Sequence, residues 1–283
     1  MNKNTGFSFL APAKINITLK VFGRRSDGFH NIRSVLLPVS LHDEVTVEEA
    51  GSGICVTSDD PSVPGGRSNT CHRAAELFME WAGAPKGVHI RIRKAIPSQA
   101  GLGGGSSDAA AAFRGMMALS GRVPPKETLM RMSAEIGADV PFFTLNIPVL
   151  AEGFGERLTP VDWRVPFFAL IVKPPFGMST REGYERLGRA AEDPPPETDV
   201  PAFLDWEDVI EAVSNDFEDA WMGTHPEIGE IKGELLSAGA KAAGLSGSGS
   251  AVFGLFDSAE AAHSARGMLS REDGRKLFVA RNI

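Results

Sequence analysis

Apolar and polar side chains alternate strictly near the beginning of the chain. Four aliphatic residues between positions 15 and 21 occupy every second place, and polar residues fill the places between them. This two-residue period is typical of a strand with one buried face. It predicts a strand here, with Lys14 and Asn16 together on its polar face.

Further strands are predicted where valine and isoleucine recur between short clusters of Gly, Ser, Asp and Pro. These stretches are residues 35–39, 44–49, 54–58, 88–92, 148–152, 165–173, 240–245, 251–256 and 276–279.

Helices are predicted where apolar residues recur every three or four positions. The first begins after Asn69, whose side chain can cap it, and ends at Gly83. Asp139 can cap another helix, because Pro141 follows two residues later. The remaining helices are expected after the glycines at 103–105 and up to Gly121, at 125–137, 180–190, 205–222 and 226–236, and between the last two strands.

Strands begin again at about residue 147, which indicates a second unit after a first one rich in helices. We expect two domains, residues 1–155 and 156–283. The stretch AEDPPPETDVP, residues 191–201, is rich in prolines and acids and is predicted to be a solvated surface loop.

Composition narrows the class of protein. The chain has 283 residues, 42% of them hydrophobic, and a formal net charge of -7. An acidic protein of this kind is not expected to bind nucleic acid or a membrane surface, so any anionic ligand must be held by local groups. The two cysteines, Cys55 and Cys71, form no metal or disulfide pattern, and the longest apolar run, residues 167–172, is too short to span a membrane. We therefore expect a cytoplasmic protein with a small-molecule substrate.

The stretch IPSQAGLGGGSSDAAAAF, residues 96–113, places four glycines and a pair of serines before a run of alanines. It is not a P-loop, because Ser106 and Ser107 follow its last glycine where a P-loop needs lysine. A dinucleotide fingerprint would need glycine at position 106, and no protein-kinase motif follows. A glycine loop that opens into a helix offers free N–H groups and a positive helix end, which suit a polyphosphate. A connection without chemical function remains the alternative.

Four stretches together carry a resemblance to a known family. They are PAKINITLKV at 12–21, GLGGGSSDAA at 101–110, GADVPFF at 137–143 and LSGSGSAVF at 245–253. Their order and spacing resemble the GHMP kinase superfamily over nearly the whole chain. More narrowly, PAKIN followed by RRSDGFHNIRSV at 24–35 resembles the GHMP kinases of the non-mevalonate isoprenoid pathway, whose acceptor is a cytidine diphosphate-linked methylerythritol.

The resemblance implies an α+β fold of two lobes, an N-terminal ribosomal-protein-like domain and a C-terminal ferredoxin-like α/β sandwich. It also implies that ATP is the phosphoryl donor and that its phosphates lie on the glycine loop, with Mg²⁺ bridging phosphate oxygens. Ser107 is the candidate protein ligand of the metal. The residues implied to bind ATP are Pro97, Gly101, Leu102, Gly103, Gly104, Gly105, Ser106 and Ser107.

The same resemblance assigns the catalytic pair. It makes Asp139 the general base that receives the proton of the acceptor hydroxyl, and Lys14 the partner that orients it and stabilises negative charge. Read from the sequence alone, Asp139 could equally be a plain helix cap and Lys14 a solvated strand lysine.

The resemblance also implies an acceptor site. The DGFH segment corresponds to a cytidine pocket in which His30 reads the cytosine edge and the preceding aromatic stacks on the ring. Position 29 is Phe where tyrosine is usual, which keeps the π face and loses a hydroxyl. The residues implied to bind the acceptor are Asn16, Phe29, His30, Asp139, Tyr184 and Gly247.

Each of these positions has a plainer interpretation. Asn16 could satisfy a neighbouring loop, Tyr184 could pack against Leu187, and Gly247 could belong to a simple glycine hairpin. Four cations near the DGFH segment could offset a diphosphate or could simply be solvated. These cations are Lys20, Arg24, Arg25 and Arg33.

Two other functions stay open at this level. Another GHMP kinase, of the mevalonate or homoserine type, would share the glycine loop but would not need the DGFH segment. A non-catalytic nucleotide-binding or RNA-binding protein could share the fold, because fold does not fix function. The presence of both Lys14 and Asp139 argues against the second.

Overall fold

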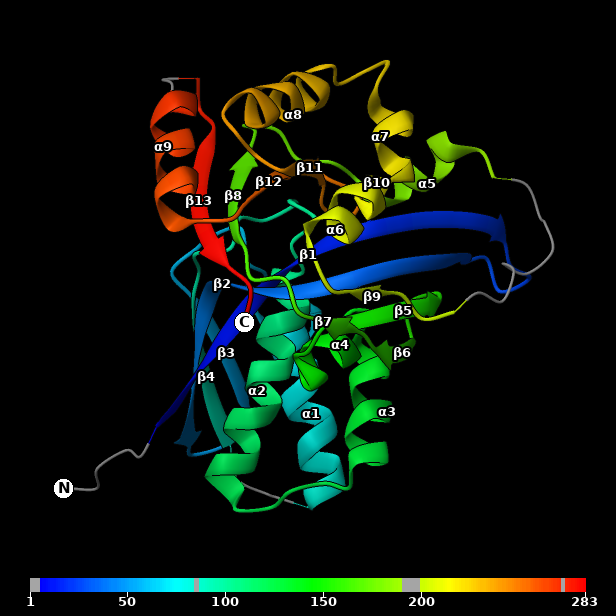
Figure 1. Ribbon diagram of the computed structural model, residues 1–283. Coiled ribbons are helices and arrows are strands. Elements are labelled where there is room, and N and C mark those ends of the chain that lie inside the picture. Colours follow the sequence, from blue (N-terminus) through cyan, green and yellow to red (C-terminus); the bar gives the residue numbers. More distant parts are fainter. Residues whose placement is uncertain (1–5, 84–86, 190–198, 271–272) are drawn as a thin grey trace. The chain divides into compact units, whose positions relative to one another are not determined.

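The computed structural model describes residues 6–83, 87–189, 199–270 and 273–283 (Figure 1). Its contacts group the chain into two compact units. Unit 1 is Met1–Ala13, His42–Ile96 and Gly103–Asn146, and unit 2 is Lys14–Leu41, Pro97–Leu102 and Ile147–Ile283. The units are interleaved in sequence, and the predicted division of the chain at residue 155 stays a prediction. The predicted loop at 191–201 lies mostly outside the described residues.

Two long strands run through both units. These are β1 (Phe7–Arg24) and β2 (His30–Ala50). The prediction of two separate strands at 35–39 and 44–49 was wrong, because β2 continues through the polar residues between them. Asp43 is fully buried there and accepts hydrogen bonds from the backbone N–H groups of Ala95 and Ile96 at 2.6 and 2.8 Å. Because these hydrogen bonds satisfy the buried carboxylate, Asp43 does not have to lie in a turn at the surface, and the strand continues through it.

In unit 1, a sheet packs against helices. Strand β2 pairs antiparallel with β4 (Gly87–Arg93), and β3 (Ile54–Ser58) pairs parallel with β4. A helix approaches this sheet closely at Gly115, because a Cβ there would meet Val47 at 2.3 Å. Figure 1 shows the main helices on one face of these strands. They are α1 (Thr70–Ala82), α2 (Gly104–Ser120), α3 (Lys126–Ile136) and α4 (Val140–Leu145), preceded by the short η1 (Gly66–Ser68).

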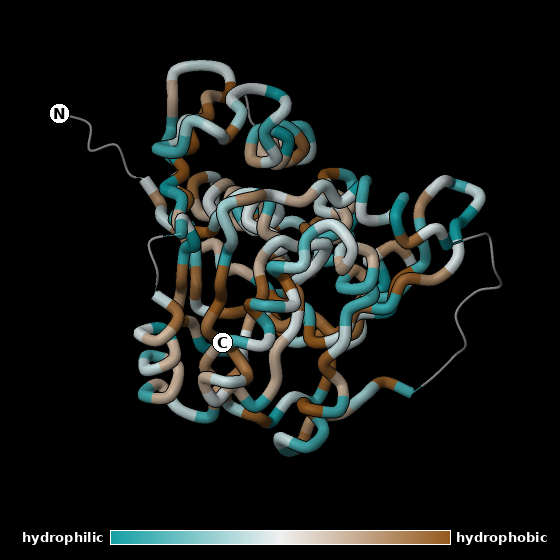
Figure 2. The backbone as a smooth tube through the Cα atoms, turned by 90° about the horizontal axis from the view of Figure 1, so that it is seen from above, coloured by the Kyte–Doolittle hydropathy of each residue, from teal (hydrophilic) through white to brown (hydrophobic). Residues whose placement is uncertain are grey.

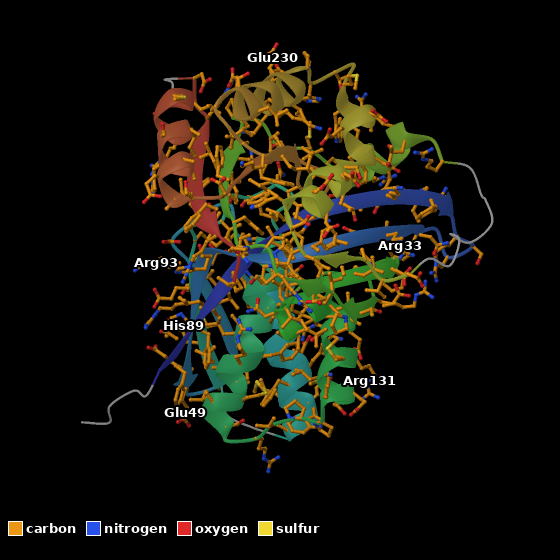
Figure 3. All side chains as sticks on the ribbon, viewed as in Figure 1. Arg33, Glu49, His89, Arg93, Arg131 and Glu230 are labelled. Carbon is orange, nitrogen blue, oxygen red and sulfur yellow. The ribbon has the colours of Figure 1, made fainter. Side chains whose placement is uncertain are left out.

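The other face of this sheet is polar. Figure 3 shows the side chains of His89 and Arg93 on the outer side of β4, and their aliphatic neighbours Val88, Ile90 and Ile92 are buried. The alternation predicted from the sequence is therefore confirmed in this strand. Figure 2 shows how hydrophobic and hydrophilic residues are distributed along the backbone.

In unit 2, β1 and β2 continue side by side, with β10 (Ser214–Asn215) beside β1 and with β5 (Val149–Gly153) and β6 (Arg157–Pro160) beside β2. A second sheet is antiparallel and has the order β11 (Ala242–Leu245), β12 (Val252–Phe256), β8 (Phe168–Lys173), β13 (Lys276–Arg281). Helices α8 (Glu227–Ser237) and α9 (Ala259–Leu269) pack on it, which confirms the ferredoxin-like C-terminal fold. The remaining elements are α5 (Thr180–Leu187), α6 (Trp206–Ala212), α7 (Asp216–Trp221) and the small pair β7 (Asp162–Trp163) and β9 (Ala202–Phe203).

The single helix predicted over 205–222 was wrong, because the chain forms α6 and α7 with β10 between them. Asn215 explains the break. Its side chain accepts the N–H of Phe217, which starts α7, and donates to the carbonyl oxygens of Leu245 and Gly247 at 2.7 and 2.8 Å. Its amide therefore positions the glycine-rich turn after β11.

Among the residues that the structure describes, none of the helices has the length and apolar character needed to cross a bilayer. The expectation of a cytoplasmic location stays a prediction.

Candidate functional site

Lys14 and Asn16 lie on the same face of β1 in unit 2, and each is only 4% exposed. The ammonium of Lys14 donates to Asn16 Oδ1 at 2.5 Å, and Asn16 Nδ2 donates to Ser34 Oγ of β2 at 2.8 Å. The backbone N–H of Lys14 also donates to the carbonyl oxygen of Leu102 at 3.0 Å. Lys14 is therefore a buried, oriented cation, and the interpretation as a solvated strand lysine was wrong.

The glycine-rich turn after β11 reaches the same place in unit 2. The N–H of Gly247 donates to Asn16 Oδ1 at 2.7 Å, and a Cβ at Gly247 would lie 3.1 Å from Lys14 Nζ. Ser246 Oγ donates to the carbonyl oxygen of Gly101 at 3.0 Å, and a Cβ at Gly101 would meet the Ser246 carbonyl oxygen at 1.9 Å. Three segments far apart in sequence thus meet around one ammonium, and the turn is a hairpin that also shapes the site.

The second half of the glycine loop begins a helix in unit 1. Gly103, at φ +74°, is the N-cap of α2, and no side chain caps the helix. The N–H groups of its first turn are therefore available to an anionic ligand. Thr70 Oγ1, at the start of α1, donates to the Gly105 carbonyl oxygen at 2.7 Å and ties the two helix starts together. Ser106 is half-buried, as is Pro97 at the start of the loop in unit 2.

Ser107 is fully buried in the first turn of α2, and its hydroxyl oxygen has no hydrogen-bond partner. A buried hydroxyl without a partner is uncommon in folded proteins. Such an oxygen is suited to a ligand that would complete its hydrogen bonding, and the predicted contact of Ser107 with a metal or phosphate stays a prediction.

Asp139 lies at the start of α4 in unit 1 and is half-buried. Its carboxylate makes no capping hydrogen bond to the helix, although the residue occupies the N-cap position with Pro141 in the first turn. The alternative interpretation, a plain helix cap, was therefore wrong. The pairing of Asp139 with Lys14 stays a prediction, because the two residues belong to different units.

A pocket of about 780 Å³ lies in unit 2 where the turn between β1 and β2 faces α5. Two of the predicted acceptor residues that line it come from the DGFH segment, and a third comes from α5. The lining residues are Arg24, Gly28, Phe29, His30, Phe154, Thr180, Arg181, Tyr184, Glu185, Gly188 and Arg189.

The aromatic rings of this pocket are arranged in two groups. His30 stacks on Tyr184 with ring centroids 5.0 Å apart and planes 12° apart, and Phe217 meets the Tyr184 ring edge-on. Phe29 is 58% exposed and lies 5.4 Å from Phe154. Tyr184 therefore supports His30, whereas Phe29 lines the pocket with a largely exposed ring. The predicted stacking of a base on Tyr184 stays a prediction.

The four cations proposed near a diphosphate differ in their surroundings. Arg25 pairs with Asp27 at 2.9 Å, and Arg33 pairs with Glu152 at 3.0 Å. Arg24 lines the pocket, and its guanidinium donates to the carbonyl oxygen of Gly28 at 3.2 Å. Lys20 is exposed and does not line the pocket.

Sequence reasoning missed one aromatic wall of this pocket. Phe154 lies in the turn between β5 and β6, where GFGE shows no periodic pattern, and it carries the guanidinium of Arg25 over its ring at 5.6 Å. Only the pairing of β5 with β2 brings this turn next to the DGFH segment.

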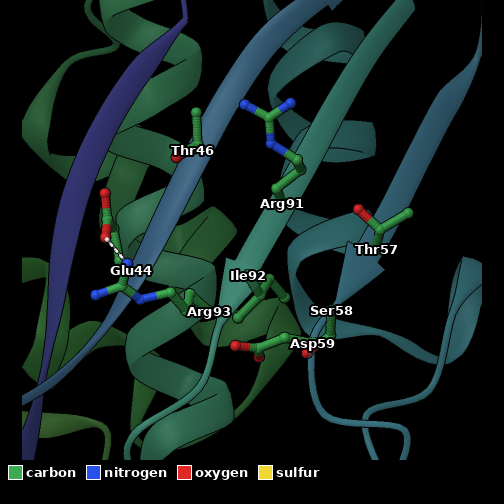
Figure 4. Close-up of a pocket in the computed structure, with 8 residues that line it drawn as sticks. All are labelled: Glu44, Thr46, Thr57, Ser58, Asp59, Arg91, Ile92 and Arg93. Carbon is green, nitrogen blue, oxygen red and sulfur yellow. Dashed lines mark ion pairs between the residues drawn. The ribbon is translucent and has the colours of Figure 1, made fainter.

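A shallower hollow of about 420 Å³ lies on the outer face of the sheet in unit 1 (Figure 4). Both of its arginines pair with carboxylates, one in the lining and one just outside it. Arg93 lies 3.7 Å from Glu44, and Arg91 lies 2.6 Å from Glu48. Because these charges are satisfied within the strands, the hollow has no convergent reactive group and is a weaker candidate than the site in unit 2.

Comparisons with known proteins agree with this geometry. The family model described as the GHMP kinases N terminal domain matches residues 69–146, and the one described as GHMP kinases C terminal matches residues 200–276.

Two similar relatives carry the name 4-diphosphocytidyl-2-C-methyl-D-erythritol kinase. The one from Citrifermentans bemidjiense is 40% identical over 97% of this chain and 98% of its own length. The one from Geobacter metallireducens is 43% identical over 90% of this chain and 91% of its own.

Among solved structures, a 4-(cytidine 5'-diphospho)-2C-methyl-D-erythritol kinase matches with a TM-score of 0.82 and 36% identity, over 98% of this chain and 99% of that one. A homoserine kinase from Cytophaga hutchinsonii matches with a TM-score of 0.75 and 19% identity, over 100% of this chain and 96% of that one, which shows a shared fold alone.

Proposed function

Because the chain belongs to the 4-diphosphocytidyl-2-C-methyl-D-erythritol kinase family of the GHMP kinases, we propose that it transfers the γ-phosphoryl group of ATP to the 2-hydroxyl of that alcohol. The products are the 2-phosphate and ADP. The observation that carries the choice of acceptor is the aromatic pocket in unit 2, which a kinase of a small aliphatic alcohol does not need.

His30 gives this pocket a preference for one pyrimidine. Its Nδ1 lies 3.0 Å from the carbonyl oxygen of Phe22. A carbonyl oxygen only accepts, so Nδ1 of the neutral ring carries the proton and Nε2 is left as an acceptor. An acceptor at this place matches the exocyclic amino group of cytosine and is mismatched with the carbonyl oxygen of uracil.

The stack of His30 on Tyr184 holds the imidazole plane, and the exposed face of Phe29 is the surface on which the base would lie. Arg24 is the lining arginine that would meet a diphosphate, because the other two in the lining, Arg181 and Arg189, already pair with Glu185 and Asp216. The acceptor would therefore be held at its cytidyl end, away from the hydroxyl that reacts.

Phosphoryl transfer needs positioning and neutralisation of charge more than covalent chemistry. The N–H groups at the start of α2 would bind the phosphates of ATP, and the Lys14 ammonium, fixed by Asn16, would stabilise negative charge near Gly101 and Gly247. Asp139 would accept the proton of the 2-hydroxyl, for which an ionised carboxylate within hydrogen-bond reach suffices.

Mg²⁺, when bound with ATP, neutralises charge on the phosphate oxygens and favours transfer. Ser107 is the residue of this chain that would contact it, because its buried hydroxyl oxygen lacks a partner in the first turn of α2.

The test is ADP release by the purified protein with Mg-ATP and four alcohols. These are 4-diphosphocytidyl-2-C-methyl-D-erythritol, 2-C-methyl-D-erythritol without the cytidyl diphosphate, mevalonate and homoserine. Turnover with the cytidyl compound alone is expected. Turnover with mevalonate or homoserine instead would overturn the acceptor assignment, and no turnover with any of them, from protein that binds ATP, would favour a non-catalytic nucleotide-binding protein.

A further inference from the structure

A buried cluster of charges lies under the start of α2 in unit 1. The ammonium of Lys94 donates to Asp43 Oδ2 and, at 2.8 Å, to Asp108 Oδ2. The side chain of Lys94 is 8% exposed, and those of Asp43 and Asp108 are 0% and 3% exposed. Charged groups are this deeply buried only when they are paired.

Each carboxylate of this cluster belongs to an element that shapes the glycine loop. Asp43 accepts hydrogen bonds from the N–H groups of Ala95 and Ile96, where the chain passes from β4 to the glycine loop. Asp108 lies in α2, immediately after the first turn that carries the free N–H groups. Lys94 therefore joins the segment before the loop to the helix after it.

The ammonium lies directly against the loop. A Cβ at Gly104 would lie 3.2 Å from Lys94 Nζ and 3.2 Å from a methyl group of Ile96. Gly104 is the first residue of α2. Its lack of a side chain thus leaves room for the ammonium, in addition to any room that it leaves for a phosphate.

Two buried atoms near this cluster have no hydrogen-bond partner, Ser107 Oγ and Asp108 Oδ1. Both atoms lie in the first two turns of α2, and neither has a hydrogen-bond partner in the protein. Unsatisfied buried polar atoms are unfavourable unless a ligand or water completes them. They point to a segment arranged for a bound ligand rather than for its own stability.

We propose that Lys94 is a positioning residue for ATP: by bridging Asp43 and Asp108 it fixes the first turn of α2 in the geometry that binds the phosphates. This proposal rests on the proposed function, because it takes the glycine loop as the ATP site. The sequence pattern of β4 already indicates that Lys94 faces inward. Val88, Ile90 and Ile92 form the buried face of β4, and Lys94 is the next residue on that face.

The test measures ATP affinity by calorimetry, KM for ATP and for the alcohol, and the free energy of unfolding. Lys94→Met alone leaves buried Asp43 and Asp108 without their shared cation and is expected to destabilise the fold. The variant for the affinity measurement is therefore Lys94→Met with Asp43→Asn, in which the amide oxygen still accepts the two N–H groups. We expect its Kd and KM for ATP to rise about tenfold or more, with KM for the alcohol within about twofold of wild type.

Arg275→Met is the matched control. Arg275 is 11% exposed and also lies between two carboxylates, Glu234 at 2.6 Å and Asp273 at 2.8 Å, in unit 2. Its loss is expected to lower stability and to leave Kd for ATP unchanged. An ATP affinity within about twofold of wild type in the folded Lys94→Met, Asp43→Asn protein would overturn the proposal.

Gly104→Ala gives a second measurement if the double variant does not fold. Its added methyl group crowds the ammonium and keeps every charge, and we expect ATP affinity to fall about fivefold or more. Unchanged affinity would overturn the proposal by this route. A wild-type protein that binds no ATP at all would instead overturn the proposed function itself.

Discussion

The amide of Asn16 is hydrogen-bonded through both its oxygen and its nitrogen. Its oxygen accepts from the ammonium of Lys14 and the N–H of Gly247, and its nitrogen donates to the hydroxyl of Ser34. The amide nitrogen can only donate and the oxygen can only accept, so the network fixes which way the side chain points. One residue thus aims the lysine at the backbone of the glycine-rich turn.

At the same scale, Asp139→Asn tests the proton acceptor. The amide keeps the shape of the side chain and cannot take a proton, so kcat is expected to fall by about 10²- to 10⁴-fold while Kd for ATP changes little. Single-turnover kinetics and calorimetry measure the two quantities. Asp162→Asn, at an exposed aspartate paired with Arg164, is the control. Near-normal turnover of the Asp139 variant would remove it as the base.

Phe29 tests the acceptor pocket. It is 58% exposed, so Phe29→Ala is expected to cost little stability, whereas loss of stacking on the base raises KM for the cytidyl alcohol by roughly tenfold. KM for ATP is expected to stay the same. Phe29→Tyr keeps the π face and is expected to bind at least as well as wild type. If Phe29→Ala left KM for the alcohol unchanged, the base would not stack there.

At the scale of elements, the period of apolar residues correctly predicted the strands that have one polar face. It gave wrong boundaries where a buried polar residue lies inside a strand or between two helices. Asp43 lies inside β2, at a place where its neighbours suggested a break, and Asn215 interrupts a helical pattern because a strand position beside β1 stabilises it. Both depend on partners more than 25 residues away, such as Ile96 and Leu245. A local pattern holds no information about such partners.

Asp108, in the first two turns of α2, contributes to the pH dependence of stability. Burial, followed by the nearby charge of Asp43, raises the pKa of Asp108 to about 7, although Lys94 opposes the shift. The folded protein then binds a proton there that the unfolded chain, with its ordinary pKa near 3.8, has lost. Stability from this group is present below pH 3.8 and is lost as pH rises towards about 7.

Asp108→Asn removes this proton. We therefore expect the free energy of unfolding of the variant to rise relative to that of wild type between about pH 4 and pH 7 and to stay level above that. Urea titrations of both proteins across this range measure the difference. A difference that is constant with pH would show that Asp108 does not titrate there.

At the scale of the whole molecule, the family, the mixed α and β fold and the kinase class could all be predicted, because four motifs keep their order along nearly the whole chain. The division of the chain into two units whose segments alternate along the sequence could not be predicted. It arises because β1 and β2 are long enough to contribute to both, and strand length beyond a polar interruption is not visible in the sequence.

The way in which the segments of the two units alternate along the chain also explains which parts of the candidate site could be predicted from the sequence. Lys14 and Asn16 of the PAKIN stretch, the first half of the glycine loop and SGSGS belong to unit 2, where they contact one another. Phe154 and Lys94 were missed, because the first lies in a turn without a pattern and the second reads as one more strand lysine. Their roles follow from pairing between strands.

The most direct measurement follows the γ-phosphoryl group itself. The purified protein is incubated with γ-labelled Mg-ATP and 4-diphosphocytidyl-2-C-methyl-D-erythritol, and the position of the label is read by phosphorus NMR of the isolated product. We predict one new phosphomonoester on the 2-hydroxyl of the intact cytidyl compound, in equal amount to the ADP formed. Label in inorganic phosphate alone, or on a different hydroxyl, would contradict the account of the site given above.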